Sequence, residues 1–231
     1  MTLNDRLRSV NERIAAACAR AGRAPADVRL VVVTKTVNSG AIRELLAAGM
    51  RDIGENRVHD AARKAAELGG IQATLHMIGH LQRNKAREAV ELFDMIHSID
   101  SLRLAEAVSA AAGELGKRMP VLLEANVSGE ESKYGFTPDS AREAAPVIAA
   151  MPGLQLQGLM TMAPLGADEA TIRSVFRGLR ELAASISREH AIPLPHLSMG
   201  MSQDYEIAIE EGATLVRVGT AIVGEGRRDK S

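Results

Sequence analysis

Two stretches decide the fold of this chain: Leu197-Ser198-Met199-Gly200-Met201-Ser202-Gln203-Asp204 and Val216-Arg217-Val218-Gly219-Thr220. In the first, a short apolar strand over 195–197 runs into a small-residue turn, where Gly200 allows close backbone approach and Ser202 is expected to cap a helix over 203–210. In the second, a β-type run over 214–218 ends in Gly219 and Thr220, which offer a backbone N–H and a hydroxyl. Free N–H groups at a helix start favour a phosphate. The two stretches together predict one anion site at two adjacent strand ends.

Either stretch alone is also explained as an ordinary strand–helix junction, which many α/β proteins contain. The pair is more specific, because the last two strand–helix loops of (β/α)₈ barrels recurrently hold a phosphate. That interpretation requires the rest of the chain to form a barrel.

The remaining sequence alternates between strand and helix patterns. The first twenty residues repeat apolar side chains at three- and four-residue steps, which predicts an amphipathic helix that ends at Gly22. A β-branched run over 28–34 is typical of a strand buried on both faces. Further strands are predicted over 52–54, 74–78, 95–99, 120–127, 154–160, 195–197 and 214–218. Helices are predicted after Ser39 to residue 48 and over 56–68, 84–92, 101–115, 138–150, 168–189 and 203–210.

About eight strands, each except the last followed by a helix, predict an α/β fold: a single (β/α)₈ TIM-type barrel with an extra N-terminal helix over 1–22. A doubly wound open sheet is the alternative. No linker, charge run or change in composition divides the chain, so one domain over 1–231 is expected.

Composition excludes several classes of function. The 231 residues are 46% hydrophobic and 25% charged with a formal net charge of −1, which gives no electrostatic reason to bind nucleic acid or a membrane. The aromatic content of 2% argues against a platform for stacking bases. The single Cys18 forms no internal disulfide, and neither a signal peptide nor a long apolar run is visible. The cytoplasm is therefore the expected location.

Lys35 closes the first buried strand. A lysine there is expected to be partly desolvated, which favours the neutral amine that a Schiff base requires. The plainer interpretation is that its side chain reaches out of the barrel mouth into solvent.

Arg217 lies between Val216 and Val218, and alternation places its side chain opposite those of the two valines. The guanidinium needs an acceptor, either a carboxylate in a structural ion pair or an atom of a ligand. His76 and His80 have the spacing of a helical metal pair, but the residues between them are typical of a strand end, which disfavours zinc.

Motifs over nearly the whole chain resemble those of the YggS-type pyridoxal phosphate homeostasis proteins. They are Val33-Thr34-Lys35-Thr36, Gly54-Glu55-Asn56-Arg57, His76-Met77-Ile78-Gly79, Leu81-Gln82-Arg83-Asn84-Lys85, Lys133-Tyr134-Gly135, Gly158-Leu159-Met160-Thr161-Met162, Leu197-Ser198-Met199-Gly200-Met201-Ser202 and Val216-Arg217-Val218-Gly219-Thr220-Ala221-Ile222.

The resemblance implies a barrel akin to the N-terminal domain of alanine racemase that holds pyridoxal 5′-phosphate (PLP). It implies that Lys35 is the Schiff-base lysine and that Arg217 faces the pyridine nitrogen. It further implies that Asn56 and His76 lie near the ring. The phosphate cradle implied by the same matches consists of Ser198, Gly200, Ser202, Gly219 and Thr220.

Two functions remain, a PLP carrier or regulator in vitamin B6 homeostasis and a weak amino-acid racemase; a lysine aldolase without PLP is a distant third. An arginine at the pyridine nitrogen weakens the ring as an electron sink, and no further domain supplies a catalytic tyrosine, so the carrier is favoured. The expected partners are PLP and PLP-requiring apo-enzymes, and the expected state is a monomer. Lys133, in the polar loop over 128–137, is a candidate second amine to receive PLP in transfer, although ordinary solvent exposure is the plainer interpretation.

Overall fold

Eight parallel strands form a closed barrel in the computed structural model, which describes residues 1–130 and 134–224. The strands are β1 (Arg29–Val33), β2 (Asp52–Glu55), β3 (Thr74–Met77), β4 (Met95–Ile99), β5 (Met119–Glu124), β6 (Leu154–Met160), β7 (His196–Ser198) and β8 (Leu215–Val218). Closure is direct, because β1 pairs with β8 from Arg29 opposite Leu215 to Val32 opposite Val218. The predicted (β/α)₈ barrel is confirmed, and the open sheet is excluded.

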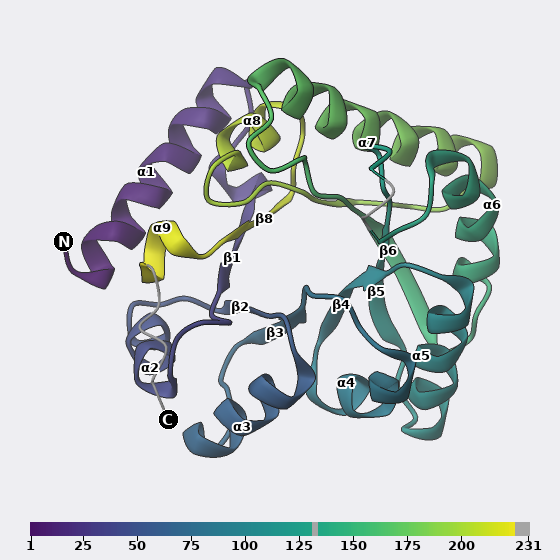
Figure 1. Ribbon diagram of the computed structural model, residues 1–231, viewed down its shortest axis with the longest axis horizontal. Helices are drawn as coiled ribbons and strands as arrows, with labels where there is room; N and C mark the ends of the chain where they lie inside the picture. The colour runs from purple at the N-terminus through teal and green to yellow at the C-terminus, as the bar shows by residue number, and fades with distance from the viewer. Residues whose placement is uncertain (131–133, 225–231) are drawn as a thin grey trace.

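The helices surround the strands, as Figure 1 shows. They are α1 (Leu3–Arg20), α2 (Ser39–Ala47), α3 (Val58–Leu68), α4 (Ala86–Leu92), α5 (Leu102–Glu114), α6 (Pro138–Ala149), α7 (Glu169–His190), α8 (Tyr205–Glu210) and α9 (Thr220–Val223), with 3₁₀ turns η1 (Pro25–Asp27) and η2 (Arg83–Lys85). The last strand was expected to lack a helix, but α9 follows it. No helix in the described ranges is both long enough and apolar enough to span a bilayer.

The extra N-terminal helix, α1, begins with a capping box in which Thr2 and Asp5 satisfy each other's backbone N–H groups. Its apolar side packs against α8 and α9 outside the barrel (Figure 1). Arg13 and Arg20 bind Glu206 and Glu210 of α8 at 2.5 and 2.7 Å. Such exposed pairs add little energy each. They join α1 to α8 on the outside of the barrel.

Two apolar layers follow from strand alternation. Inside the barrel lie Val31, Met95, Leu122, Met160 and Leu215, whereas residues such as Val32, Val216 and Val218 pack outward beneath the helices. Arg217 is two residues beyond Leu215 and therefore shares the inward face. The barrel interior is thus a packed core that becomes polar toward its mouth.

Two predicted helix starts are wrong. Asn56 forms a bend and Arg57 is extended, so α3 begins at Val58, and the chain turns through 202–204 before α8 begins at Tyr205. Contacts at the barrel mouth hold the extra residues out of the two helices. Asn38, not Ser39, caps α2, with its side chain accepting from Ala41 N at 3.1 Å.

Candidate cofactor site

A cavity of about 480 Å³ opens at the carboxyl ends of the strands. Six of the nine candidate residues line it: Lys35, Asn56, Ser202, Arg217, Gly219 and Thr220. The structure therefore brings residues that follow or end β1, β2, β7 and β8 together around one cavity. His76, Ser198 and Gly200 do not line it.

Lys35 lies in the turn that follows β1, and its side chain is exposed at the cavity. The expected partial desolvation is wrong, because the strand ends at Val33 and the buried Thr34 separates Lys35 from it. The amine is consequently accessible to a carbonyl compound entering from solvent.

Beneath Lys35 lies a buried ion pair. Lys64 Nζ of α3 donates to Glu55 Oε1 and to the Thr34 carbonyl, each at 2.7 Å, and the Thr34 hydroxyl donates to the same Glu55 oxygen at 2.5 Å. All three side chains are at most 2% exposed. The cluster ties the end of β1, which precedes Lys35, to the end of β2, which precedes Asn56.

Asn56 is half-buried at the cavity wall, and Gly79 packs directly on its backbone. A Cβ at Gly79 would lie 2.4 Å from the Asn56 carbonyl oxygen, so a larger residue would displace this strand end. The contact holds the Asn56 backbone in a bend outside α3.

Ser202 does not cap α8, contrary to the prediction. Its hydroxyl accepts the backbone N–H of Gly219 at 3.1 Å and that of Ala221 at 3.4 Å. Asp204 Oδ1 instead accepts Met201 N–H at 2.5 Å and closes the turn. Ser202 thus joins the two stretches that were expected to form the anion cradle.

Gly200 has φ of +92°, a conformation that residues with a Cβ rarely adopt. A Cβ there would also lie 2.6 Å from that of Ala208 in α8. The close approach that Gly200 permits is therefore to α8, and its contribution to the cavity is the shape of the turn.

Arg217 points into the barrel and is only 4% exposed. It donates to Ser198 Oγ at 2.5 Å and to the Thr161 carbonyl at 3.0 Å, which uses two of its five N–H donors. Within the described ranges no carboxylate lies at salt-bridge distance from it. Burial lowers its pKa to about 10, opposed by the charges of Asp204 and Glu124, so the guanidinium remains positive at neutral pH.

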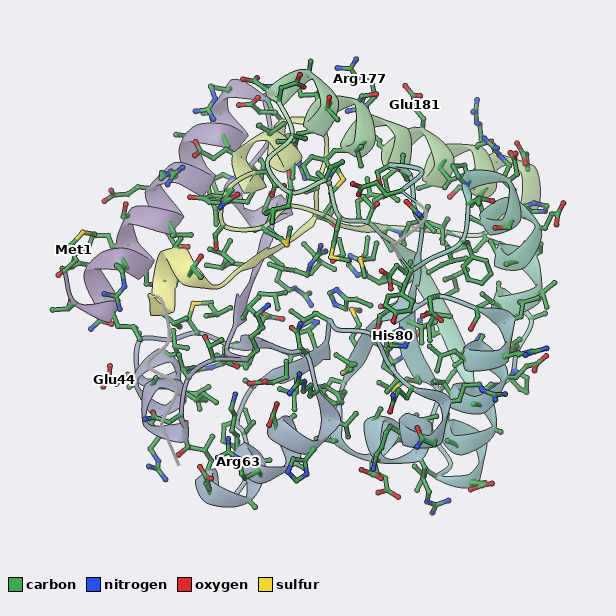
Figure 2. The ribbon with its side chains drawn as sticks, viewed as in Figure 1. Met1, Glu44, Arg63, His80, Arg177 and Glu181 are labelled. Atoms are coloured by element: carbon green, nitrogen blue, oxygen red, sulfur yellow. The ribbon has the colours of Figure 1, made fainter. Side chains whose placement is uncertain are left out.

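His76 lies deeper than the cavity, in the middle of β3. Its ring is fully buried, with Nδ1 2.9 Å from His97 Nε2 and Nε2 3.0 Å from Asp52 Oδ1. His80 lies elsewhere, paired with Asp100 at 2.9 Å and stacked on Tyr134. Figure 2 places His80 inside the ring of helices, whereas Arg63, Arg177 and Glu181 project outward. The two histidines thus engage different partners.

Sequence reasoning missed the wall formed by the loop after β6. Residues 163–167 line the cavity together with Met162 and Ile172, and Leu165 is 87% exposed at its rim. It also missed Glu124, which ends β5 and is 4% exposed. The strand was predicted over 120–127, which placed Glu124 inside it and not at its carboxyl end, so the signal of a carboxylate at a strand end was missed. Lys133, the predicted second amine, falls outside the described residues.

The residues that meet at this cavity suit a ligand with three features. Lys35 supplies an exposed amine for an aldehyde, and Arg217 supplies a buried, fixed donor for a ring acceptor. Gly219 lets an anion approach the backbone closely, and the Ser202 and Thr220 hydroxyls are donors for it. The paired strand-end loops also match the usual phosphate position of such barrels.

Comparison with known proteins agrees with this geometry. The family model of the alanine racemase N-terminal domain matches residues 6–226. A pyridoxal phosphate homeostasis protein from Aquifex aeolicus is 41% identical over 225 residues, which are 97% of this chain and 99% of that protein. The pyridoxal phosphate homeostasis protein of Escherichia coli K12 is 39% identical over 94% of each chain.

Solved structures show the same relation. PipY from Synechococcus elongatus PCC7942, with PLP bound, superposes with a TM-score of 0.85 at 40% identity, covering 96% of this chain and 100% of that one. Alanine racemase from Clostridium difficile 630 shares only the fold, with a TM-score of 0.75 at 16% identity over 97% of this chain and 58% of that enzyme. The chain therefore belongs to the family of the pyridoxal phosphate homeostasis proteins, a branch of the alanine racemase N-terminal fold.

Proposed function

We propose that this protein binds PLP reversibly and serves the intracellular homeostasis of that cofactor. The observation that carries the proposal is the meeting of an accessible amine, a buried guanidinium and the joined β7 and β8 loops on one cavity. The names of the full-length relatives and the PLP held by PipY support it.

The proposed roles follow the placement of each residue. Lys35 Nζ condenses with the aldehyde of PLP to a Schiff base with release of water, and Arg217 donates to the pyridine nitrogen. Ser202, Gly219 and Thr220 hold the phosphate, and Asn56 lies beside the ring. Ser198 and Gly200 act indirectly, through the orientation of Arg217 and the shape of the turn.

We further propose that binding, rather than turnover, is the role of the site. A cationic group at the pyridine nitrogen disfavours its protonation, and the bound cofactor then supplies little electron-sink chemistry. PLP-requiring apo-enzymes in the cytoplasm are the proposed recipients. A closed barrel leaves no strand edge for pairing with a second chain, which supports a monomer.

Lys35→Ala is expected to abolish the yellow absorption band that PLP gives the purified protein, because no other amine of the described residues lines the cavity. Borohydride reduction followed by peptide mapping should place the pyridoxyl group on Lys35. Lys85→Ala, which removes a lysine outside the cavity, should keep the full band. A full band in Lys35→Ala, with the label on another lysine, would contradict the assignment.

Removing the Ser202 and Thr220 hydroxyls together, as Ser202→Ala with Thr220→Val, is expected to weaken PLP binding by roughly 2–4 kcal/mol. The estimate takes about 1–2 kcal/mol for each charge-assisted hydrogen bond. Affinities are measured by fluorescence titration of PLP and of pyridoxal, which lacks the phosphate. The double substitution should leave the weak binding of pyridoxal unchanged; an equal loss for both ligands would place the anion elsewhere.

A further inference from the structure

A continuous chain of hydrogen bonds crosses the barrel beneath the cavity. Asp52 Oδ1 lies 3.0 Å from His76 Nε2, and His76 Nδ1 lies 2.9 Å from His97 Nε2. His97 Nδ1 lies 2.9 Å from Ser198 Oγ, which accepts from Arg217 at 2.5 Å. The chain therefore runs from the first residue of β2, at the amino end of the barrel, to the arginine that lines the cavity.

The chain is isolated from water along most of its length. The two histidines and Ser198 are fully buried, and Arg217 is nearly so. The side chain of Asp52 is 18% exposed, so the chain reaches solvent at the end opposite the cavity. In a site of low polarity, unpaired donors and acceptors are costly, which favours one fully satisfied arrangement.

The chemistry of the two ends fixes the direction of every bond. Arginine only donates and an ionised carboxylate only accepts, while a neutral imidazole has one donor and one acceptor. His76 therefore donates through Nε2 to Asp52 and accepts at Nδ1 from His97 Nε2–H. His97 then accepts at Nδ1 from the Ser198 hydroxyl. Each donor points away from Arg217 and toward Asp52.

The groups around the histidine pair disfavour an added proton at His97. Burial, followed by the nearby His76 and Arg217, holds the pKa of His97 well below its usual value, and His196 and Arg29 act in the same direction. Arg29 also lies 3.6 Å from Asp52, and burial lowers the pKa of His196. At the other end Arg217 faces Asp204 and Glu124. The remaining inward side chains at this level are apolar: Val31, Met95, Leu122, Met160 and Leu215.

We propose that Asp52, His76, His97 and Ser198 are positioning residues that hold Arg217 in its cofactor-facing orientation and couple its hold on PLP to the charge at the far end of the barrel. The proposal rests on the proposed function, because it assigns the cofactor to the cavity that Arg217 lines.

A proton added to the histidine pair reverses the chain. His76 Nδ1–H then donates to His97 Nε2, and His97 Nδ1–H donates to Ser198 Oγ, which already accepts from Arg217. The Ser198 hydroxyl loses its acceptor, and a second positive charge lies within the same buried chain as the guanidinium. PLP affinity is therefore expected to fall as the chain takes up this proton.

Asp52→Asn is the informative substitution, because Asp52 is remote from the cavity and asparagine has the same shape without the charge. It is expected to weaken PLP binding about fivefold or more at neutral pH, the lower part of the usual range for coupled sites. Its dissociation constant should also depend less on pH than that of the parent on the acid side of the ordinary histidine range, where a histidine whose pKa is lowered takes up its proton.

A matched control separates coupling from structure. Ser98→Ala removes a buried hydroxyl of the same strand as His97, one that donates to the Gly79 carbonyl instead. It should keep PLP affinity within about twofold and retain the pH profile of the parent, as substitutions outside a coupled network usually do.

The chain itself is tested without cofactor by NMR on protein with isotope-labelled histidine. His76 and His97 should both carry the proton on Nε2, and Ser198→Ala should shift the ring resonances of His97. A proton on Nδ1 of His97 at neutral pH would overturn the proposed direction.

The PLP titrations distinguish two failures. A parent protein that does not bind PLP overturns the proposed function. A parent that binds PLP, with Asp52→Asn indistinguishable from Ser98→Ala in affinity and pH profile, overturns only the coupling.

Discussion

Replacing Lys64 by methionine is expected to lower the free energy of unfolding by about 3–5 kcal/mol, the usual cost of removing one partner of a buried ion pair. Methionine approximates the volume of the lysine but leaves Glu55 buried without its cation. Glu55 Oε2 already lacks a hydrogen-bond partner among the described residues, so the carboxylate has little else to satisfy it. The Thr34 carbonyl also loses one of its two donors and keeps the Val37 N–H.

Urea denaturation at neutral pH measures this loss. Arg63→Met is a matched control, because Arg63 precedes Lys64 in α3 and pairs with Glu67 on the surface; its effect should stay below about 1 kcal/mol. Adding Glu55→Gln to Lys64→Met should recover part of the stability by removing the uncompensated charge. A cost for Lys64→Met no larger than that for Arg63→Met would show that the pair contributes nothing.

Glu124→Gln is expected to stabilise the protein by about 2–3 kcal/mol at pH 8 and hardly at all near pH 4.5. Burial, reinforced by the charge of Asp100, raises the pKa of Glu124 from its usual 4.5 to about 7, against the opposing effect of Arg217. The folded chain thus binds more protons than the unfolded chain between these two values. Its stability falls as the pH rises through that window, and the full penalty is present above pH 7.

The neutral glutamine avoids this penalty, so the difference between variant and parent should grow from about pH 4.5 to about pH 7 and then level off. Thermal or urea unfolding across this range measures the difference. Glu143→Gln, an exposed substitution on α6, should show no such growth. A stabilisation that is independent of pH would indicate that packing, and not ionisation, separates the two side chains.

Strand positions were predictable because buried parallel strands are continuous apolar runs. The predicted strands over 95–99 and 154–160 agree with β4 and β6 residue by residue. The starts of α3 and α8 were not predictable. Gly79 holds Asn56 out of α3 through a tertiary contact, and Asp204 closes the turn that precedes α8. A serine before a helical pattern is an ordinary helix-capping signal. Nothing in the neighbouring sequence indicates that the Ser202 hydroxyl instead accepts a hydrogen bond from Gly219 N–H.

Depth within the barrel explains which candidate residues reach the cavity. Asn56 directly follows β2 and Lys35 lies two residues beyond the end of β1, whereas His76 lies inside β3. Strand alternation correctly predicts that the Arg217 side chain points to the opposite face from those of the two valines. Alternation alone does not tell whether an inward side chain reaches the cavity or lies in the layer beneath it. The partners of His76, from β2 and β4, come from strands that the sequence does not align in register.

The pairing of β1 with β8 determines when the cavity comes into existence during synthesis. Lys35 follows the first strand of the barrel and Arg217 lies in the last, so the ribosome completes the two sides of the site at widely separated times. Contacts so distant along the chain form slowly and late in folding. On the proposed assignment, a nascent chain exposes the amine of Lys35 well before it has the guanidinium and the loops that would retain PLP. Capture of the cofactor would thus report that β8 has been synthesised and that the barrel has closed.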